Sequence, residues 1–229
     1  MNPFSTAATR AREIAKTLQG RGVVLGIAGA LAVSLIAHAT EQDRPPPLQA
    51  LEKMVSKPMT DSVWGRLQSS RWVADGSDKA PKTVYVFTDL NCPYCNKFWS
   101  DARPWVDTGR VQLRHVIVGI LTPTSPGKAA ALLTEKDAAA VLASYERGQV
   151  AGTKKAMTSG RPHPLSDDGM KPLASVPPAI QRQLDANEKV MTDLGLRATP
   201  AIVWRNDMGT VQMRTGIPDE ALAAIFGPR

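Results

Sequence analysis

The chain has 229 residues, 43% of them hydrophobic, and a formal net charge of +7. This length allows one or two domains, and the apolar content is enough for a real core. The lysines and arginines are dispersed among acidic residues, without the basic stripe and stacking aromatics of a nucleic-acid-binding protein, so we expect no nucleic-acid partner.

The N-terminal segment, residues 1–39, has the pattern of an export signal. Residues 1–21 are polar and basic, and residues 22–39 contain no charged side chain. This order fits a secretory signal with a small-x-small cleavage site around His38, and it fits an uncleaved membrane anchor through residues 22–39 equally well. In both cases the positive end stays inside and the rest of the chain is exported. We expect no catalytic role for His38.

Residues 40–75 are predicted to be a linker. Residues 40–47 end in three consecutive prolines, which favours an extended segment. Residues 48–68 then show helical periodicity and predict a linker helix. We assign the remainder, residues 76–229, to one main domain.

A pair of cysteines separates a predicted strand from a predicted helix. Residues 83–88 are β-branched and aromatic, as in a buried strand, and apolar side chains recur at helical spacing over residues 93–106. Between them lies Cys92-Pro93-Tyr94-Cys95, which contains the only two cysteines of the sequence. Because the start of a helix favours an anion, we expect a lowered pKa and a thiolate at Cys92. Cys95, one turn further on, would attack a mixed disulfide formed at Cys92, so the spacing indicates thiol–disulfide exchange.

The other interpretations of this pair are weaker. A structural disulfide across so short a loop would remove little entropy from the unfolded chain. A zinc site would need two more ligands, and His38, His115 and His163 do not form a second cluster. We therefore expect no metal and no cofactor other than the redox-active disulfide between Cys92 and Cys95.

Two neighbours of the pair have predicted local roles. Pro93 suits the first position of the helix, because the N–H of a residue at that position has no partner within the helix and proline lacks that N–H. Asp89 lies three residues before Cys92. It would either tune the pair or relay protons, or cap the turn before the helix, and the sequence leaves both alternatives open.

The rest of the chain predicts alternating strands and helices around one loop-like region. The predicted elements are a strand over residues 111–120, helices over 127–148 and 178–196, a loop-like region over 151–176, a hairpin of 202–204 with 211–214, and a closing helix over 218–226. We expect His115 in the strand and His163 in the loop to be structural or surface residues.

A proline stands at the start of the last core strand, in the sequence Thr199-Pro200-Ala201-Ile202. Proline cannot donate to a sheet ladder, so its place at a core strand calls for a special reason. In thioredoxin-like folds the reason is a cis bond that packs against the cysteine pair and exposes the preceding backbone to a substrate strand. An ordinary trans proline is the alternative.

About residues 60–229 resemble the catalytic domain of the DsbC/DsbG family of periplasmic thiol:disulfide interchange proteins. The order and spacing of many short matches carry the resemblance. They are Phe87-Thr88-Asp89, Cys92-Pro93-Tyr94-Cys95, Phe98-Trp99, Ala102-Arg103-Pro104-Trp105-Val106-Asp107, Gly109, Val111-Gln112-Leu113-Arg114, Val118-Gly119, Ser125-Pro126, Ala129-Ala130-Ala131, Asn187-Glu188-Lys189, Met191, Asp193-Leu194-Gly195 and Thr199-Pro200-Ala201-Ile202.

The resemblance implies an α/β, thioredoxin-like fold with a helical insertion over about residues 123–196, preceded by the signal or anchor helix and the linker helix. It implies a periplasmic disulfide reductase or isomerase that also reduces sulfenylated cysteines. The implied partners are envelope proteins with disulfides or oxidised cysteines and a membrane thiol reductase of the DsbD type. The implied catalytic residues are Cys92 and Cys95, and the implied substrate-binding residues are Thr199, Pro200, Pro93 and Tyr94.

The chain departs from the family in two ways. Too few residues separate the apolar run from the linker helix for the family's N-terminal dimerisation domain, which is linked to isomerase activity and to shielding from the membrane oxidase. Val86 stands where thioredoxins hold a buried acid. A disulfide-donating oxidase and a non-catalytic chaperone or assembly factor therefore remain open, whereas the export signal and the insertion disfavour a glutaredoxin, which shares the Cys-Pro-Tyr-Cys motif.

Overall fold

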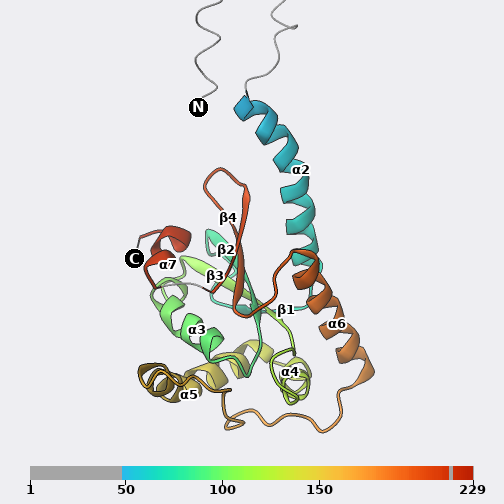
Figure 1. Cartoon of the computed structure of the whole chain (residues 1–229), viewed down its shortest axis with the longest axis vertical. Helices are drawn as coiled ribbons and strands as arrows, with labels where there is room; N and C mark the ends of the chain where they lie inside the picture. Colours follow the sequence, from blue (N-terminus) through green and yellow to red (C-terminus); the bar gives the residue numbers. More distant parts are fainter. Residues whose placement is uncertain (1–47, 217–218, 229) are drawn as a thin grey trace, which may run out of the picture. The chain divides into compact units, whose positions relative to one another are not determined.

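The computed structural model of the protein describes residues 48–216 and 219–228 (Figure 1). The predicted signal or anchor, residues 1–39, and the proline-rich segment 40–47 lie outside this range. No helix within it combines the length and the apolar character needed to cross a bilayer. The elements are α2 (Leu48–Ser69), β1 (Trp72–Asp75), β2 (Lys82–Thr88), α3 (Pro93–Val106), β3 (Val111–Ile117), α4 (Ser125–Leu133), α5 (Ala138–Thr158), α6 (Pro178–Asp193), β4 (Ala201–Arg205), β5 (Val211–Thr215) and α7 (Asp219–Phe226).

A five-stranded mixed sheet with the order β1-β3-β2-β4-β5 forms the centre of the fold. Strands β2 and β3 are parallel, as the crossover through α3 requires, and the other neighbouring pairs are antiparallel. The predicted hairpin is confirmed as β4 and β5, whose turn closes with a hydrogen bond from the Gly209 N–H to the Asn206 carbonyl (2.8 Å). The predicted strand 83–88, helix 93–106 and closing helix are also confirmed.

Alternation along β2 explains why its whole sequence is apolar. Val84 and Val86 face the side of the sheet that α3 and α7 cover. Tyr85 and Phe87 face the opposite side, against α2 and α6 (Figure 1). Because helices cover both faces, side chains of either parity along the strand are buried.

The helical insertion forms a separate apolar cluster at one end of the sheet. Leu132 of α4, Leu142 and Tyr145 of α5, and Leu184 of α6 pack together against Leu90 and Ile117. Helix α5 also packs along α3, so the insertion lies directly beside the helix that carries the cysteines (Figure 1).

Three predicted boundaries were wrong. The helix predicted over 127–148 is two helices, and α5 continues to Thr158, through the first part of the predicted loop. Glycine costs a helix only about 1 kcal/mol, and α5 buries Thr153 and Ala156 beyond Gly148 and Gly152, which offsets that cost. Strand β3 ends at Ile117 rather than at 120, because the chain then turns to bind Asp89.

The sheet begins before residue 76, within the predicted linker. Strand β1 pairs antiparallel with β3 at the sheet edge, and four residues are too few to show a periodic pattern. Its last residue, Asp75, accepts hydrogen bonds from both terminal nitrogens of Arg103 on α3 and lies 3.5 Å from His115 Nε2. Burial acts to raise the pKa of Asp75, but the bonds and charges of His115 and Arg103 outweigh it and lower the pKa to about 2.

We predict that Asp75→Asn destabilises the protein near neutral pH by about 2 kcal/mol. The folded pKa of Asp75 lies below its unfolded value, so its contribution is complete above about pH 4 and is lost as the pH falls toward about 2. Urea unfolding near neutral pH and at about pH 2 measures the free energy of unfolding of the parent and the variant. Asp107→Asn, which removes a mostly exposed partner of the same Arg103, is the control and should change stability by less than about 0.5 kcal/mol. A pH-independent gap between Asp75→Asn and the parent would contradict the prediction.

Candidate active site

Cys92 is the N-cap of α3, and its sulfur takes the place of the usual capping oxygen. Its backbone is extended, with φ −84° and ψ 112°, and the Cys95 N–H points to the Cys92 Sγ at 3.4 Å. Pro93 follows as the first helical residue, as predicted, where no N–H is needed. The sulfur of Cys92 therefore lies at the positive end of the helix, in the place where an anion is stabilised.

The Thr199–Pro200 peptide bond is cis, as predicted. It precedes β4, which pairs with β2, and it lies beside the start of α3. The Cys92 thiol donates to the Thr199 carbonyl oxygen at 3.4 Å. The structure thus brings together two segments 107 residues apart in sequence.

The two cysteines are free thiols with opposite acidities. The hydrogen bond from the Cys95 side chain lowers the pKa of Cys92 to about 7; burial opposes this, and bonds from the Thr199 side chain and the Cys95 N–H assist it. Burial, and then the neighbouring Cys92, raise the pKa of Cys95 well above its ordinary value. Near neutral pH Cys92 is therefore a substantial fraction thiolate, while Cys95 stays protonated.

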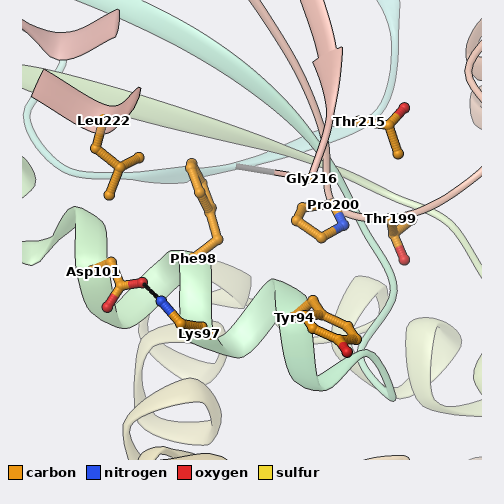
Figure 2. A pocket seen from close by; sticks show the side chains of 9 residues that line it. All are labelled: Tyr94, Lys97, Phe98, Asp101, Thr199, Pro200, Thr215, Gly216 and Leu222. Carbon is orange, nitrogen blue, oxygen red and sulfur yellow. Dashed lines mark hydrogen bonds and ion pairs between the residues drawn. The ribbon is translucent and has the colours of Figure 1, made fainter. Parts of the chain in front are cut away.

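Two cavities flank the Thr199–Pro200 bond. Figure 2 shows the smaller one, of about 220 Å³, between the first turns of α3, the cis proline and the start of α7. The larger, of about 410 Å³, opens on the side of Cys92 itself. Tyr94 borders both cavities and is 52% exposed. The larger cavity is lined by Cys92, Pro93, Tyr94, Ile120, Leu121, Thr122, Pro162, His163, Pro164, Arg197, Ala198 and Thr199.

Asp89 caps the turn that precedes the helix. One carboxyl oxygen accepts from the Asn91 N–H (2.8 Å) and the Ser125 hydroxyl (2.9 Å). The other accepts from the N–H groups of Ile120 (2.8 Å) and Leu121 (2.9 Å). Of the two alternatives left open by the sequence, the cap accounts for these contacts.

Several residues of the site were missed by sequence reasoning. His163 is exposed, as expected, and it also lines the larger cavity, as does Arg197. Ile120, predicted as the last residue of a strand, and Leu121, which follows it, contribute apolar side chains to the lining of the larger cavity. No local pattern marks these positions, because the cavity is assembled from loops that are distant in sequence.

A family model described as thioredoxin matches residues 69–207. The chain belongs to the thioredoxin family. The predicted thioredoxin-like α/β fold with inserted helices is thereby confirmed, and the cysteine pair of this thioredoxin-family chain lies at the start of α3, the helix that follows β2.

Two curated relatives of this thioredoxin-family chain are named thiol:disulfide interchange protein DsbG. The chain is 42% identical to the protein of Pseudomonas aeruginosa over 182 residues, which cover 79% of this chain and 65% of that protein. It is 41% identical to the protein of Escherichia coli over 170 residues, covering 74% of this chain and 62% of that protein. The matched region spans just under two thirds of the length of each relative.

Solved structures share the same fold at lower identity. The catalytic domain of Proteus mirabilis ScsC is 21% identical to this chain, and the two structures superpose with a TM-score of 0.53. The aligned region covers 74% of this chain and 95% of that domain. A periplasmic thioredoxin-like protein from Salmonella enterica serovar Typhimurium is 19% identical, with a TM-score of 0.50. The aligned region covers 72% of this chain and 93% of that protein.

We predict that alkylation of the reduced protein is confined to Cys92 and that its rate titrates with a midpoint near pH 7. The reason is that the thiolate, not the thiol, reacts, and Cys95 remains protonated across this range. Iodoacetamide labelling followed by peptide mass spectrometry measures both rates. In Cys95→Ala, which has no side-chain donor, the loss of the hydrogen bond from the Cys95 side chain should move the Cys92 midpoint upward. Equal labelling of both cysteines would contradict the prediction.

Proposed function

We propose that the protein is a thiol–disulfide oxidoreductase that reduces or isomerises disulfides in protein substrates. The observation that carries the proposal is the cysteine pair beside the cis proline. Both cysteines are buried, but Cys92 has a lowered pKa and borders a cavity, whereas Cys95 has a raised pKa. An acidic first thiol and a protonated second thiol are what a two-step exchange needs.

In the first step, the Cys92 thiolate attacks one sulfur of a substrate disulfide. A mixed disulfide forms, and the other substrate sulfur leaves as a thiolate. In the second step, the Cys95 thiol loses its proton to solvent and attacks the Cys92 sulfur, which releases the remaining substrate thiolate. Two electrons pass from the cysteine pair to the substrate, and the Cys92–Cys95 disulfide is the only redox group involved.

The Cys92 sulfur would also be the attacking atom when the substrate is a sulfenylated cysteine. The Cys92 thiolate would attack the sulfur of the sulfenic acid and displace hydroxide, which takes up a proton to become water. Resolution by Cys95 then proceeds as for a disulfide.

The exposed apolar side chains of Ile120 and Leu121, which line the cavity beside Cys92, favour a protein segment as substrate. We assign its contacts to Thr199 and Pro200 on one side and to Pro93 and Tyr94 on the other, since these line the cavities next to the sulfur. Asp89 supports the site by holding the turn in shape.

We infer that the protein works in the periplasm on envelope proteins with disulfides or oxidised cysteines, and that a membrane thiol reductase of the DsbD type reduces it. The similarity to two proteins named thiol:disulfide interchange protein DsbG supports this. Acid-quenched cells whose thiols are labelled with a mass-adding maleimide test the direction of electron flow. A pair that is mainly reduced, and becomes oxidised without the reductase, supports a reductase or isomerase; a pair that is oxidised in both cases marks a disulfide-donating oxidase.

We predict that Cys92→Ser abolishes exchange with a disulfide-bonded substrate, whereas Cys95→Ser accumulates mixed disulfides at Cys92. In the first variant no thiol can attack; in the second, the attack occurs but no thiol resolves it. Non-reducing gels and mass spectrometry of the trapped species measure both outcomes. Equal residual activity in the two variants would contradict the assignment of Cys92 as the attacking cysteine and Cys95 as the resolving cysteine.

The variant with both cysteines changed to serine separates the proposal from a non-catalytic chaperone. Because the proposed activity resides in the two thiols, this variant should lose its effect on substrate oxidation state. Undiminished protection of a client against aggregation would instead favour the chaperone function.

A further inference from the structure

Glu146 is a buried carboxyl group beside the helix that carries the cysteines. It lies on the side of α5 that packs against α3, and only 1% of the residue is exposed. Glutamate is almost never fully buried unless it is paired, and no positively charged side chain bonds to this carboxyl in the described part of the chain. This group has no part in the exchange steps described above.

The partner of Glu146 is Asn96, which directly follows Cys95. The Asn96 side-chain N–H₂ donates to the Glu146 carboxyl Oε2 at 2.6 Å and to the Glu146 carbonyl at 2.7 Å. The other side-chain atom, Asn96 Oδ1, is buried and lacks a hydrogen-bond donor among the described residues. A protonated carboxyl group carries the O–H donor that a carboxylate lacks, so the surroundings of Glu146 suit its neutral form.

The charges around Glu146 come from three elements. Burial raises its pKa to about 7, against the opposing Asn96 bond and the His115 charge, and the negative charges of Cys92 and Asp75 raise it further. His115 lies on β3, and Asp75 on β1 is already paired with Arg103. Of these groups, Cys92 is the one whose charge disappears when the disulfide forms.

We propose that Glu146 takes up a proton when the Cys92–Cys95 pair is reduced and releases it when the pair is oxidised. The inference rests on the proposed function. Burial already favours a proton on Glu146, and because a carboxylate and a thiolate disfavour each other in a buried site, the Cys92 thiolate favours that proton further. When the pair passes two electrons to a substrate disulfide, the thiolate becomes a neutral disulfide sulfur, and solvent takes the Cys95 proton together with the Glu146 proton. Glu146 thus acts through the charge of Cys92, without touching the substrate.

The coupling makes the redox equilibrium depend on pH beyond the titration of the cysteines themselves. The reduced protein should bind more protons than the oxidised protein by the amount that Glu146 gains, which is less than about half a proton near neutral pH because burial raises the pKa of Glu146 in both forms. Since the carboxylate opposes the thiolate, its removal should also lower the pKa of Cys92.

We predict that Glu146→Gln weakens the pH dependence of the equilibrium between the cysteine pair and a dithiol buffer, measured from about pH 6 to about pH 8. The glutamine carbonyl can still accept from Asn96, and its N–H₂ can donate to the unpaired Asn96 oxygen, so the variant should fold. Glu135→Gln, at an exposed position, is the matched control and should behave as the parent. An unchanged pH dependence in Glu146→Gln would overturn the proposal.

A measurement on the parent protein makes the test independent of the variant. The side-chain carboxyl carbon of Glu146, followed by NMR, should titrate near pH 7 in the reduced form and at lower pH in the oxidised form. Reduced Cys92→Ser, which lacks the thiolate, should resemble the oxidised form. The same Glu146 midpoint in the reduced parent, the oxidised parent and reduced Cys92→Ser would overturn the proposed coupling. The proposed function would still stand in that case if the parent protein catalysed disulfide exchange.

Discussion

The site depends on the junction between the first turn of α3 and the Thr199–Pro200 bond. Strands β2 and β4 are antiparallel neighbours, with Phe87 opposite Ala201, so the last residues of β2 lie beside the first residues of β4. Cys92 follows β2 in the chain, and Pro200 directly precedes β4. The sheet register thereby places the Cys92 sulfur against the Thr199 carbonyl.

The insertion holds this junction in place. The Tyr145 hydroxyl of α5 donates to the Leu90 carbonyl at 2.8 Å, and the Leu165 N–H of the following loop donates to the Asn91 carbonyl at 3.0 Å. The Asp89 carboxylate binds the loop after β3 from the other side. The polar groups of the short segment before the cysteines are therefore satisfied by elements from three parts of the chain, which stabilises one conformation of the turn.

Two buried carboxyl groups illustrate how the neighbours decide the effect of burial. Asp75 lies between Arg103 and His115, and their bonds and charges lower its pKa despite burial. Glu146 has the neutral amide of Asn96 as its bonding partner, so burial prevails and its pKa rises. The same rule separates the two cysteines, because desolvation alone would raise both pKa values and hydrogen bonds outweigh it only at Cys92.

Local sequence patterns were enough to predict the cysteine motif, strand β2, helix α3, the last hairpin and the position of the cis proline, because these depend on the spacing of near neighbours. They did not show strand β1, which is too short for a periodic pattern, or the end of α5, where packing outweighs two glycines. The capping of a turn by Asp89 and the position of Glu146 beside the cysteine helix became apparent from the folded structure. Burial and hydrogen-bond partners come from elements distant in sequence, so no local pattern contains them.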